Sequence, residues 1–187
     1  PVSLHHLTML KQLDIDKCDW ISSIEGAEAL LSLEEMTIKQ CYALESVPYL
    51  DDMPSLQKLH LSKCPQVMRL SKAGHQTALK ELIVKFCDRL SSLRQLSDLV
   101  SLVRLTISGC SNLLWLPDLD GFYSLRCLSI DQCPRLMSLP RSGLPVSLET
   151  FFLSECNQAL EEQFQQKEGP DWNKFAALPG CKWEPCW

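Results

Sequence analysis

A cysteine recurs every 23 residues along this chain, seven times without a break. These ladder cysteines are Cys18, Cys41, Cys64, Cys87, Cys110, Cys133 and Cys156. A leucine precedes each of them by eight residues, from Leu10 to Leu148. A repeat of this length is typical of a solenoid, in which each unit cannot bury its own apolar face and stacks on its neighbours. The period therefore predicts the fold before any local preference is considered.

Within each unit the pattern L-x-x-L-x-[IL]-x-x-C contains a stretch in which apolar and polar residues alternate. Alternation with a period of two predicts a short, half-buried strand. Stacked units then give a parallel sheet with one strand per unit and a curved inner face open to solvent. Counting the first leucine as position 1, positions 12 and 15 are also apolar, as in Ile21 and Ile24. Prolines such as Pro117 favour an extended or turning return segment, and because these segments are short and carry glycines such as Gly121 we expect little regular helix there.

This pattern resembles the leucine-rich repeat, with cysteine at the position more often held by asparagine. The resemblance covers residues 1–160 and implies an α/β-type solenoid, a horseshoe with a parallel sheet on its concave face and a mostly irregular convex side. We expect residues 1–9 to be the tail of a truncated preceding repeat, since Leu4 and Leu7 are spaced like Leu96 and Leu99 in a later unit. Residues 10–160 then form seven repeats, and residues 161–187 form a capping tail. The chain is expected to be the last portion of a longer protein.

The ladder cysteines have three interpretations. A metal site needs converging ligands, whereas these thiols would form a line with one per unit. Disulfides between stacked strands are within reach, but parallel side chains have the wrong torsion and seven thiols cannot all pair. We therefore expect small buried groups whose S–H bonds weakly to nearby backbone. Cys181 and Cys186 near the end are interpreted as two free thiols, with a local bridge or half of a metal site as alternatives.

The charge and the cysteine distribution limit the partners and the compartment. The net charge is −5 and the basic residues do not cluster in the sequence, which argues against nucleic acid and anionic membrane as main partners. No apolar run is long enough for a membrane span. Unpaired ladder thiols and the absence of an N-x-[ST] sequon favour a reducing, cytoplasmic location, with the nucleus as a second compartment.

In the tail, Trp172, Phe175 and Leu178 have the spacing of one side of a short helical turn, which would cover the open end of the last repeat. The acidic pairs Asp51-Asp52 and Glu161-Glu162 are expected in solvated loops. We find no catalytic set, and we expect that this segment is not an enzyme. Cys127 is the one cysteine at an outward strand position, either a reactive thiol or an incidental one.

The tail also resembles a G-x-D-W-x-K-I-x-H-I-P-like segment that ends many plant intracellular coiled-coil nucleotide-binding leucine-rich-repeat (NLR) disease resistance proteins. Gly169, Asp171, Trp172, Lys174 and Pro179 match it, whereas Ala177 stands where histidine is usual. The resemblance implies recognition of an effector protein from a pathogen or pest and restraint of the receptor's nucleotide-binding module. It implies no cofactor in this segment, with ATP or ADP on the missing module.

Two other functions stay open. One is the substrate-recognition module of an F-box leucine-rich-repeat ubiquitin ligase, although such repeats usually run near 26 residues and carry I-T-D-like turns that are absent here. The other is a purely structural scaffold. The sequence of the full-length gene would separate the first alternative from an immune receptor.

Apolar residues at positions where the repeat pattern has polar ones mark candidate anchors on the inner face. Ile83 and Phe152 interrupt the outward strand positions, and Phe86 stands in a column of mostly polar turn residues. We hypothesise that Ile83, Lys85, Phe86 and Arg104 form a mixed apolar and basic patch suited to an acidic protein surface. The candidate partner-binding residues are His60, Ile83, Lys85, Phe86, Arg104 and Phe152. The alternative is that Phe86 folds over its own turn and Ile83 packs on the stems of Lys85 and Arg104.

Overall fold

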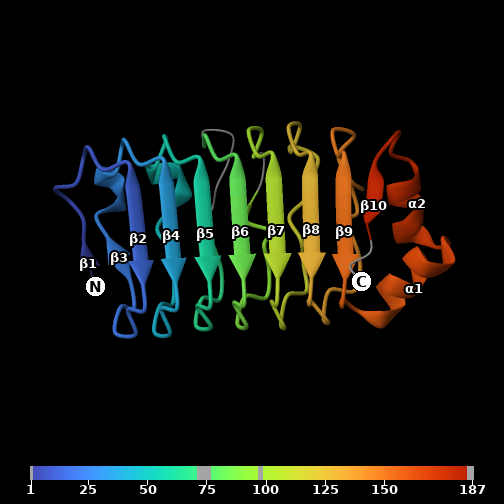
Figure 1. Ribbon diagram of the computed structural model, residues 1–187, viewed down its shortest axis with the longest axis horizontal. Helices are drawn as coiled ribbons and strands as arrows, with labels where there is room; N and C mark the ends of the chain where they lie inside the picture. Colours follow the sequence, from blue (N-terminus) through green and yellow to red (C-terminus); the bar gives the residue numbers. More distant parts are fainter. Residues whose placement is uncertain (1, 71–76, 97–98, 185–187) are drawn as a thin grey trace.

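The computed structural model, which describes residues 2–70, 77–96 and 99–184, is a parallel-sheet solenoid (Figure 1). Its main sheet has eight strands in the order β10-β9-β8-β7-β6-β5-β4-β2. The strands from β2 to β9 come from successive repeat units, and β10 pairs with β9 after the chain has passed through two helices. The strands are β2 (Gln12–Asp16), β4 (Glu35–Lys39), β5 (Lys58–Ser62), β6 (Glu81–Lys85), β7 (Arg104–Ser108), β8 (Cys127–Asp131), β9 (Thr150–Ser154) and β10 (Lys182–Glu184). The predicted leucine-rich-repeat solenoid is confirmed.

The strand register follows the 23-residue period, so that equivalent positions of successive units lie beside one another. Met36 pairs with Leu59, and Leu59 pairs with Leu82, which are all almost completely buried. Between them, the alternate residues of each strand are partly exposed. One side of the sheet therefore faces a continuous apolar core, and the other is an open face toward solvent.

The return segments lie on the far side of the core and contain little regular structure, as predicted (Figure 1). Among the described residues they hold two short 3₁₀ helices, η1 (Ala27–Ala29) and η2 (Leu50–Asp52), so Asp51 and Asp52 are exposed on a 3₁₀ turn rather than in a loop. They also hold the small parallel pair β1 (Val2–Ser3) and β3 (Ile24–Glu25), with two further bridges, Ser46 to Arg69 and Ser92 to Trp115.

The N-terminal end of the core is less covered than the middle. Leu7 is 41% exposed, whereas its counterpart Leu99 is 1% exposed. Leu10 and Leu13 are half-buried, although the equivalent leucines of the central units are buried. The apolar interior therefore reaches the surface beside β2.

All seven ladder cysteines are free, and six of them are buried, with Cys18 at the N-terminal end half-buried. Each thiol donates to the backbone carbonyl two residues earlier, as from Cys41 Sγ to Lys39 O at 3.3 Å. Burial disfavours the thiolate and raises the pKa of Cys64 and of Cys110 to about 11, and that of Cys156 to about 12. The prediction of small, buried, weakly hydrogen-bonded groups is confirmed.

Replacing Cys87 by serine is expected to destabilise the protein less than replacing it by leucine. Cys87 is completely buried, and its Sγ lies 3.5 Å from Lys85 O, so a serine hydroxyl can keep this hydrogen bond. Leucine has no donor and would overpack the column of cysteines, at a cost of about 1–3 kcal/mol. Thermal melts of both variants check this order, and a lower melting temperature for the serine variant would contradict it.

The C-terminal tail forms a cap over the last unit, and it contains more regular structure than predicted. Helices α1 (Gln158–Gln166) and α2 (Pro170–Ala176) pack beside β9, and strand β10 extends the sheet (Figure 1). Trp172, Phe175 and Leu178 contact the apolar core, as expected from their spacing. Phe164 of α1 joins them, with its ring centroid 5.5 Å from that of Phe151.

One expectation about this region is wrong, that of a loop at the acidic pair Glu161-Glu162. Ala159, at position 12 of the seventh unit, is exposed and lies in α1. Glu161 and Glu162, expected in a loop, also belong to α1, because Asn157 caps the helix by accepting a hydrogen bond from Ala159 N at 3.0 Å. Glu161 Oε1 accepts from Cys156 N at 2.8 Å, so this carboxylate joins the helix to the last ladder position. Cys181 is free, and Cys186 lies outside the described residues.

Candidate protein-binding surface

The open face of the sheet is a regular grid of side chains, with three outward residues per strand. Its middle row runs Asp14, Thr37, His60, Ile83, Thr106, Ser129 and Phe152. Neighbours in a row are about 4.8 Å apart, so adjacent side chains touch whereas those three strands apart do not. The grid therefore determines which of the predicted residues can act together.

His60, Ile83 and Lys85 lie together near the centre of the open face. His60 pairs in register with Ile83, and Lys85 is the next outward residue along β6. All three are partly buried, as are the outward residues of the neighbouring strand β4. The structure thus brings together three of the six candidates, in a cluster with an aliphatic residue beside a cation.

The imidazole of His60 has an unusual environment. Its Nε2 atom is buried and has no hydrogen-bond partner among the residues that the structure describes. Burial of the ring lowers the pKa of His60, and the positive charges of Lys39 and Lys85 lower it further, so the ring is neutral at pH 7. A buried polar atom without a partner destabilises the free protein, and a binding partner that reaches it would remove this penalty.

Phe86 lies at the turn that follows β6, where the backbone is left-handed (φ 53°). The same turn position has positive φ in every unit, at Lys17, Gln40, Lys63, Phe86, Gly109, Gln132 and Glu155. The Phe86 ring does not fold over its own turn. It lies against the next turn, at Gly109, where a β-carbon added to the glycine would be only 2.6 Å from Phe86 Cε1. Phe86 remains 42% exposed, so its outer surface is available for contact.

Arg104 and Phe152 lie apart from this cluster. Arg104 pairs in register with Glu81, at the opposite end of β6 from Lys85 and Phe86. An acidic neighbour thus reduces the basic character that the sequence predicted for this part of the face. Phe152 shares the middle row with Ile83 but is three strands away, roughly 14 Å by the strand spacing. Cys127 lies between Arg104 and Thr150, as expected from the repeat, and is half-buried.

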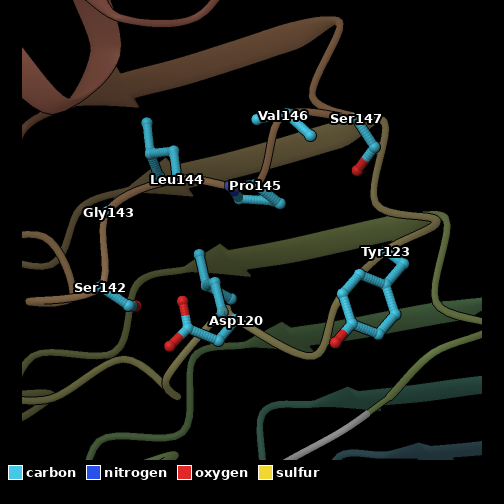
Figure 2. Close-up of a pocket in the computed structure, with 9 residues that line it drawn as sticks. Asp120, Tyr123, Ser142, Gly143, Leu144, Pro145, Val146 and Ser147 are labelled. Carbon is cyan, nitrogen blue, oxygen red and sulfur yellow. The ribbon is translucent and has the colours of Figure 1, made fainter.

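A hollow of about 280 Å³ lies elsewhere, at the edge where the strands begin (Figure 2). Figure 2 shows Asp120 and Tyr123 on one wall and the segment from Ser142 to Ser147 on the other. Tyr123 and Val146 are 74% and 83% exposed, and they are not among the residues selected from the sequence. Both residues lie two positions before the first leucine of a repeat unit, as does the exposed Leu31. Apolar residues that recur at this position are the sequence signal that could have identified the hollow.

These surfaces present several kinds of side chain that can contact a partner protein. The open-face cluster offers an aliphatic group, an aromatic ring, a neutral imidazole and an ammonium group, while the hollow offers a phenol and a carboxylate. Among the described residues, no three His, Cys, Asp or Glu side chains gather as metal ligands would. Aromatic, aliphatic and basic side chains on a rigid sheet are the groups that dominate protein interfaces.

No protein family profile matches this chain, and no curated protein matches it. None of the helices within the described parts of the chain is both long and apolar enough to cross a membrane. The fold itself defines the class of protein, which is a leucine-rich-repeat-like solenoid with an open parallel sheet face.

Proposed function

We propose that this chain is a protein-recognition segment of a plant intracellular immune receptor of the NLR class. It senses an effector protein from a pathogen or pest, and it helps to restrain the receptor's nucleotide-binding module. The observation that carries the recognition role is the group formed by His60, Ile83 and Lys85 on the open face, together with Phe86 at the turn that follows β6. A rigid sheet presents these side chains on a backbone that is already ordered, which lowers the ordering cost of binding and favours affinity.

The tail supports the choice of receptor class, because the residues that resemble the NLR segment have a definite structural role. Asp171 is buried and accepts a hydrogen bond from Leu139 N at 3.0 Å, and Lys174 Nζ donates to Leu139 O at 3.2 Å. Asp171 and Lys174 also pair with each other at 2.8 Å. A motif that closes the end of a repeat stack is useful only in a chain that ends its solenoid there.

Sensing and restraint are joined by a population shift. An effector can release a restrained receptor only if it binds the open state more tightly than the closed state. If the nucleotide-binding module and the effector compete for the cluster around Phe86, then binding of one excludes the other. In this mechanism ATP or ADP binds to the nucleotide-binding module, and no nucleotide binds to this segment.

Replacing Phe86 by alanine is expected to weaken effector binding by about 2 kcal/mol, or roughly thirtyfold, as at an interface hot spot. The immobilised chain is exposed to extracts of attacked and unattacked plant tissue, and retained proteins are identified by mass spectrometry. The affinity of a retained foreign protein is then measured by calorimetry for the wild type and the variant. Tyr123→Ala is the matched control, because it removes an exposed aromatic ring from the hollow and leaves the open face unchanged.

The outcomes separate the alternatives. A foreign protein that is retained by the wild type and by Tyr123→Ala, but lost with Phe86→Ala, supports direct sensing through the open face. Retention of a host nucleotide-binding module alone supports the restraint role and places recognition elsewhere. Equal affinities of the wild type and Phe86→Ala, with unchanged melting curves, would remove the open-face cluster as the binding site.

A further inference from the structure

The side of the solenoid opposite the open face has a separate cluster of apolar and basic residues. It lies on the return segments of four consecutive units, at positions 13 and 14, between the buried positions 12 and 15, and in one unit at position 16, directly after them. We name it the return-side patch. Its residues are Met68, Arg69, Arg94, Leu114, Trp115 and Met137. Met68, Trp115 and Met137 are 47%, 45% and 67% exposed, although the same positions in other units carry serine, as at Ser22 and Ser46.

The backbone of the return segments brings the central part of this patch together. Ser92 and Trp115 form a parallel bridge, in which Leu93 N donates to Trp115 O at 2.9 Å. Leu114 N donates to Ser91 O at 2.9 Å, so the segments of these two units run side by side. Arg94 then places its guanidinium carbon 3.9 Å from the centroid of the Trp115 ring, which is a cation–π contact. The patch is therefore a built surface rather than a scatter of exposed residues.

The charge along the four units of the return-side patch is opposite in sign to that of the whole chain. The described return residues at positions 11–17 of these units include five exposed arginines and one acid, Asp118. The arginines are Arg69, Arg89, Arg94, Arg135 and Arg141. The net charge of the whole chain is −5, so acidic groups are concentrated elsewhere.

Among the described residues the arginines of this side have no carboxylate partners, whereas some basic residues on other surfaces have one. Among the described residues, ion pairs join Lys58 to Glu35 at 2.6 Å on the open face and Lys11 to Glu34 at 3.0 Å at the strand-start edge. Arg89 instead donates to the neutral Gln66 Oε1 at 2.7 Å, and Arg135 donates to Asn112 Oδ1 at 2.9 Å. The five return-side arginines form no ion pair within the described ranges.

From the exposed Trp and Met side chains and the unpaired arginines, we infer that the return-side patch binds an acidic protein segment that carries an apolar anchor residue. The guanidinium of Arg94, which lies over the Trp115 ring, can form two parallel hydrogen bonds with a carboxylate. Trp, Met and Arg are enriched in the cores of protein interfaces, which favours a protein over a phosphate backbone. This inference does not depend on the proposed function, since the patch lies on the opposite side from Phe86.

The probe for this surface is a short fluorescein-labelled peptide in which glutamates flank a leucine, and its control is the analogue with glutamine in place of every glutamate. Fluorescence anisotropy with the full 187-residue chain measures both affinities. The acidic peptide is expected to bind and the glutamine analogue is not. Arg94→Glu and Trp115→Ala are each expected to weaken binding about tenfold or more. Arg94→Lys keeps the charge but not the planar fork, so a smaller loss is expected.

Lys80→Glu is the matched charge control, because Lys80 is exposed at the strand-start edge and donates to Gln57 Oε1 at 3.0 Å. It changes the net charge as much as Arg94→Glu does, and it should leave peptide binding unchanged. Equal losses from both variants would overturn the inference, because they would indicate attraction by net charge alone. Tighter, Arg94-dependent binding to duplex DNA or to phosphatidylserine vesicles would also overturn it, and so would failure of the acidic peptide to bind.

Discussion

Replacing Asp171 by alanine is expected to lower the free energy of unfolding by about 4 kcal/mol, the scale for breaking a buried ion pair from one side. Asp171 is only 3% exposed and is at the centre of a hydrogen-bond network. Its Oδ1 accepts from Leu139 N and from Lys174 Nζ, and its Oδ2 accepts from Gln163 Nε2 at 3.4 Å. The substitution leaves Leu139 N without its acceptor, and it removes the counter-charge of the partly buried Lys174 ammonium, which keeps its hydrogen bond to Leu139 O.

Urea unfolding followed by tryptophan fluorescence measures this loss, because Trp172 and Trp183 lie in the cap with ring centroids 6.3 Å apart. Asp118→Ala is the control, since it removes an exposed aspartate, and it is expected to change stability by less than about 0.5 kcal/mol. Asp171→Asn keeps an oxygen for Leu139 N but loses the charge facing Lys174, so an intermediate loss is expected. A loss for Asp171→Ala as small as that of Asp118→Ala would show that the cap does not depend on this carboxylate.

The repeat region could be predicted from the sequence because one period controls all of its main contacts. When equivalent positions stack, a buried leucine in one unit requires a buried residue in the next, so the pattern of a single unit predicts the core of the whole stack. The left-handed turn after each strand was not predicted, because six of the seven residues there carry side chains and only Gly109 indicates positive φ.

The tail was predicted less well, because no period governs it. The spacing of Trp172 and Phe175 indicated α2. Helix α1 depends on the Asn157 cap and on burial of Phe164 against Phe151, and no repeat pattern in the sequence predicts that contact. Strand β10 has three residues, and its pairing with β9 becomes favourable only once the helices have brought the chain back to the sheet edge.

The candidate surface was predicted only in part, because each column of the repeat was considered separately. Phe86 was selected as an apolar residue in a polar column, but it was not connected with Gly109, the one glycine in that column. The return side, where Trp115 occupies a column of mostly serine residues, is not among the surfaces predicted from the sequence. At both places, residues that depart from the usual residue type of their column occur in neighbouring units. These departures are the sequence signal that identifies the Phe86 turn and the return side.

Replacing Gly109 by alanine is expected to lower the free energy of unfolding by about 3 kcal/mol, from two separate causes. A side chain at φ 64° costs about 1 kcal/mol in backbone strain, which six other units already bear at this position. The new methyl would also overlap the edge of the Phe86 ring, so the ring or the turn must move, at about 1–3 kcal/mol for overpacking. Thermal and urea unfolding of the variant measure the sum.

A double-mutant cycle with Phe86→Ala separates the two causes. Without the ring, Gly109→Ala should cost only the strain, so the two substitutions are expected to couple by about 1–2 kcal/mol in the favourable direction. Lys63→Ala, at the same turn position one unit before Phe86, is the control partner, and it should not couple with Gly109→Ala because it lies two units from Gly109. Additive effects of Phe86→Ala and Gly109→Ala would mean that the ring does not rest on Gly109. In that case Phe86 would be free to move, and its role as a fixed anchor on the open face would lose its physical basis.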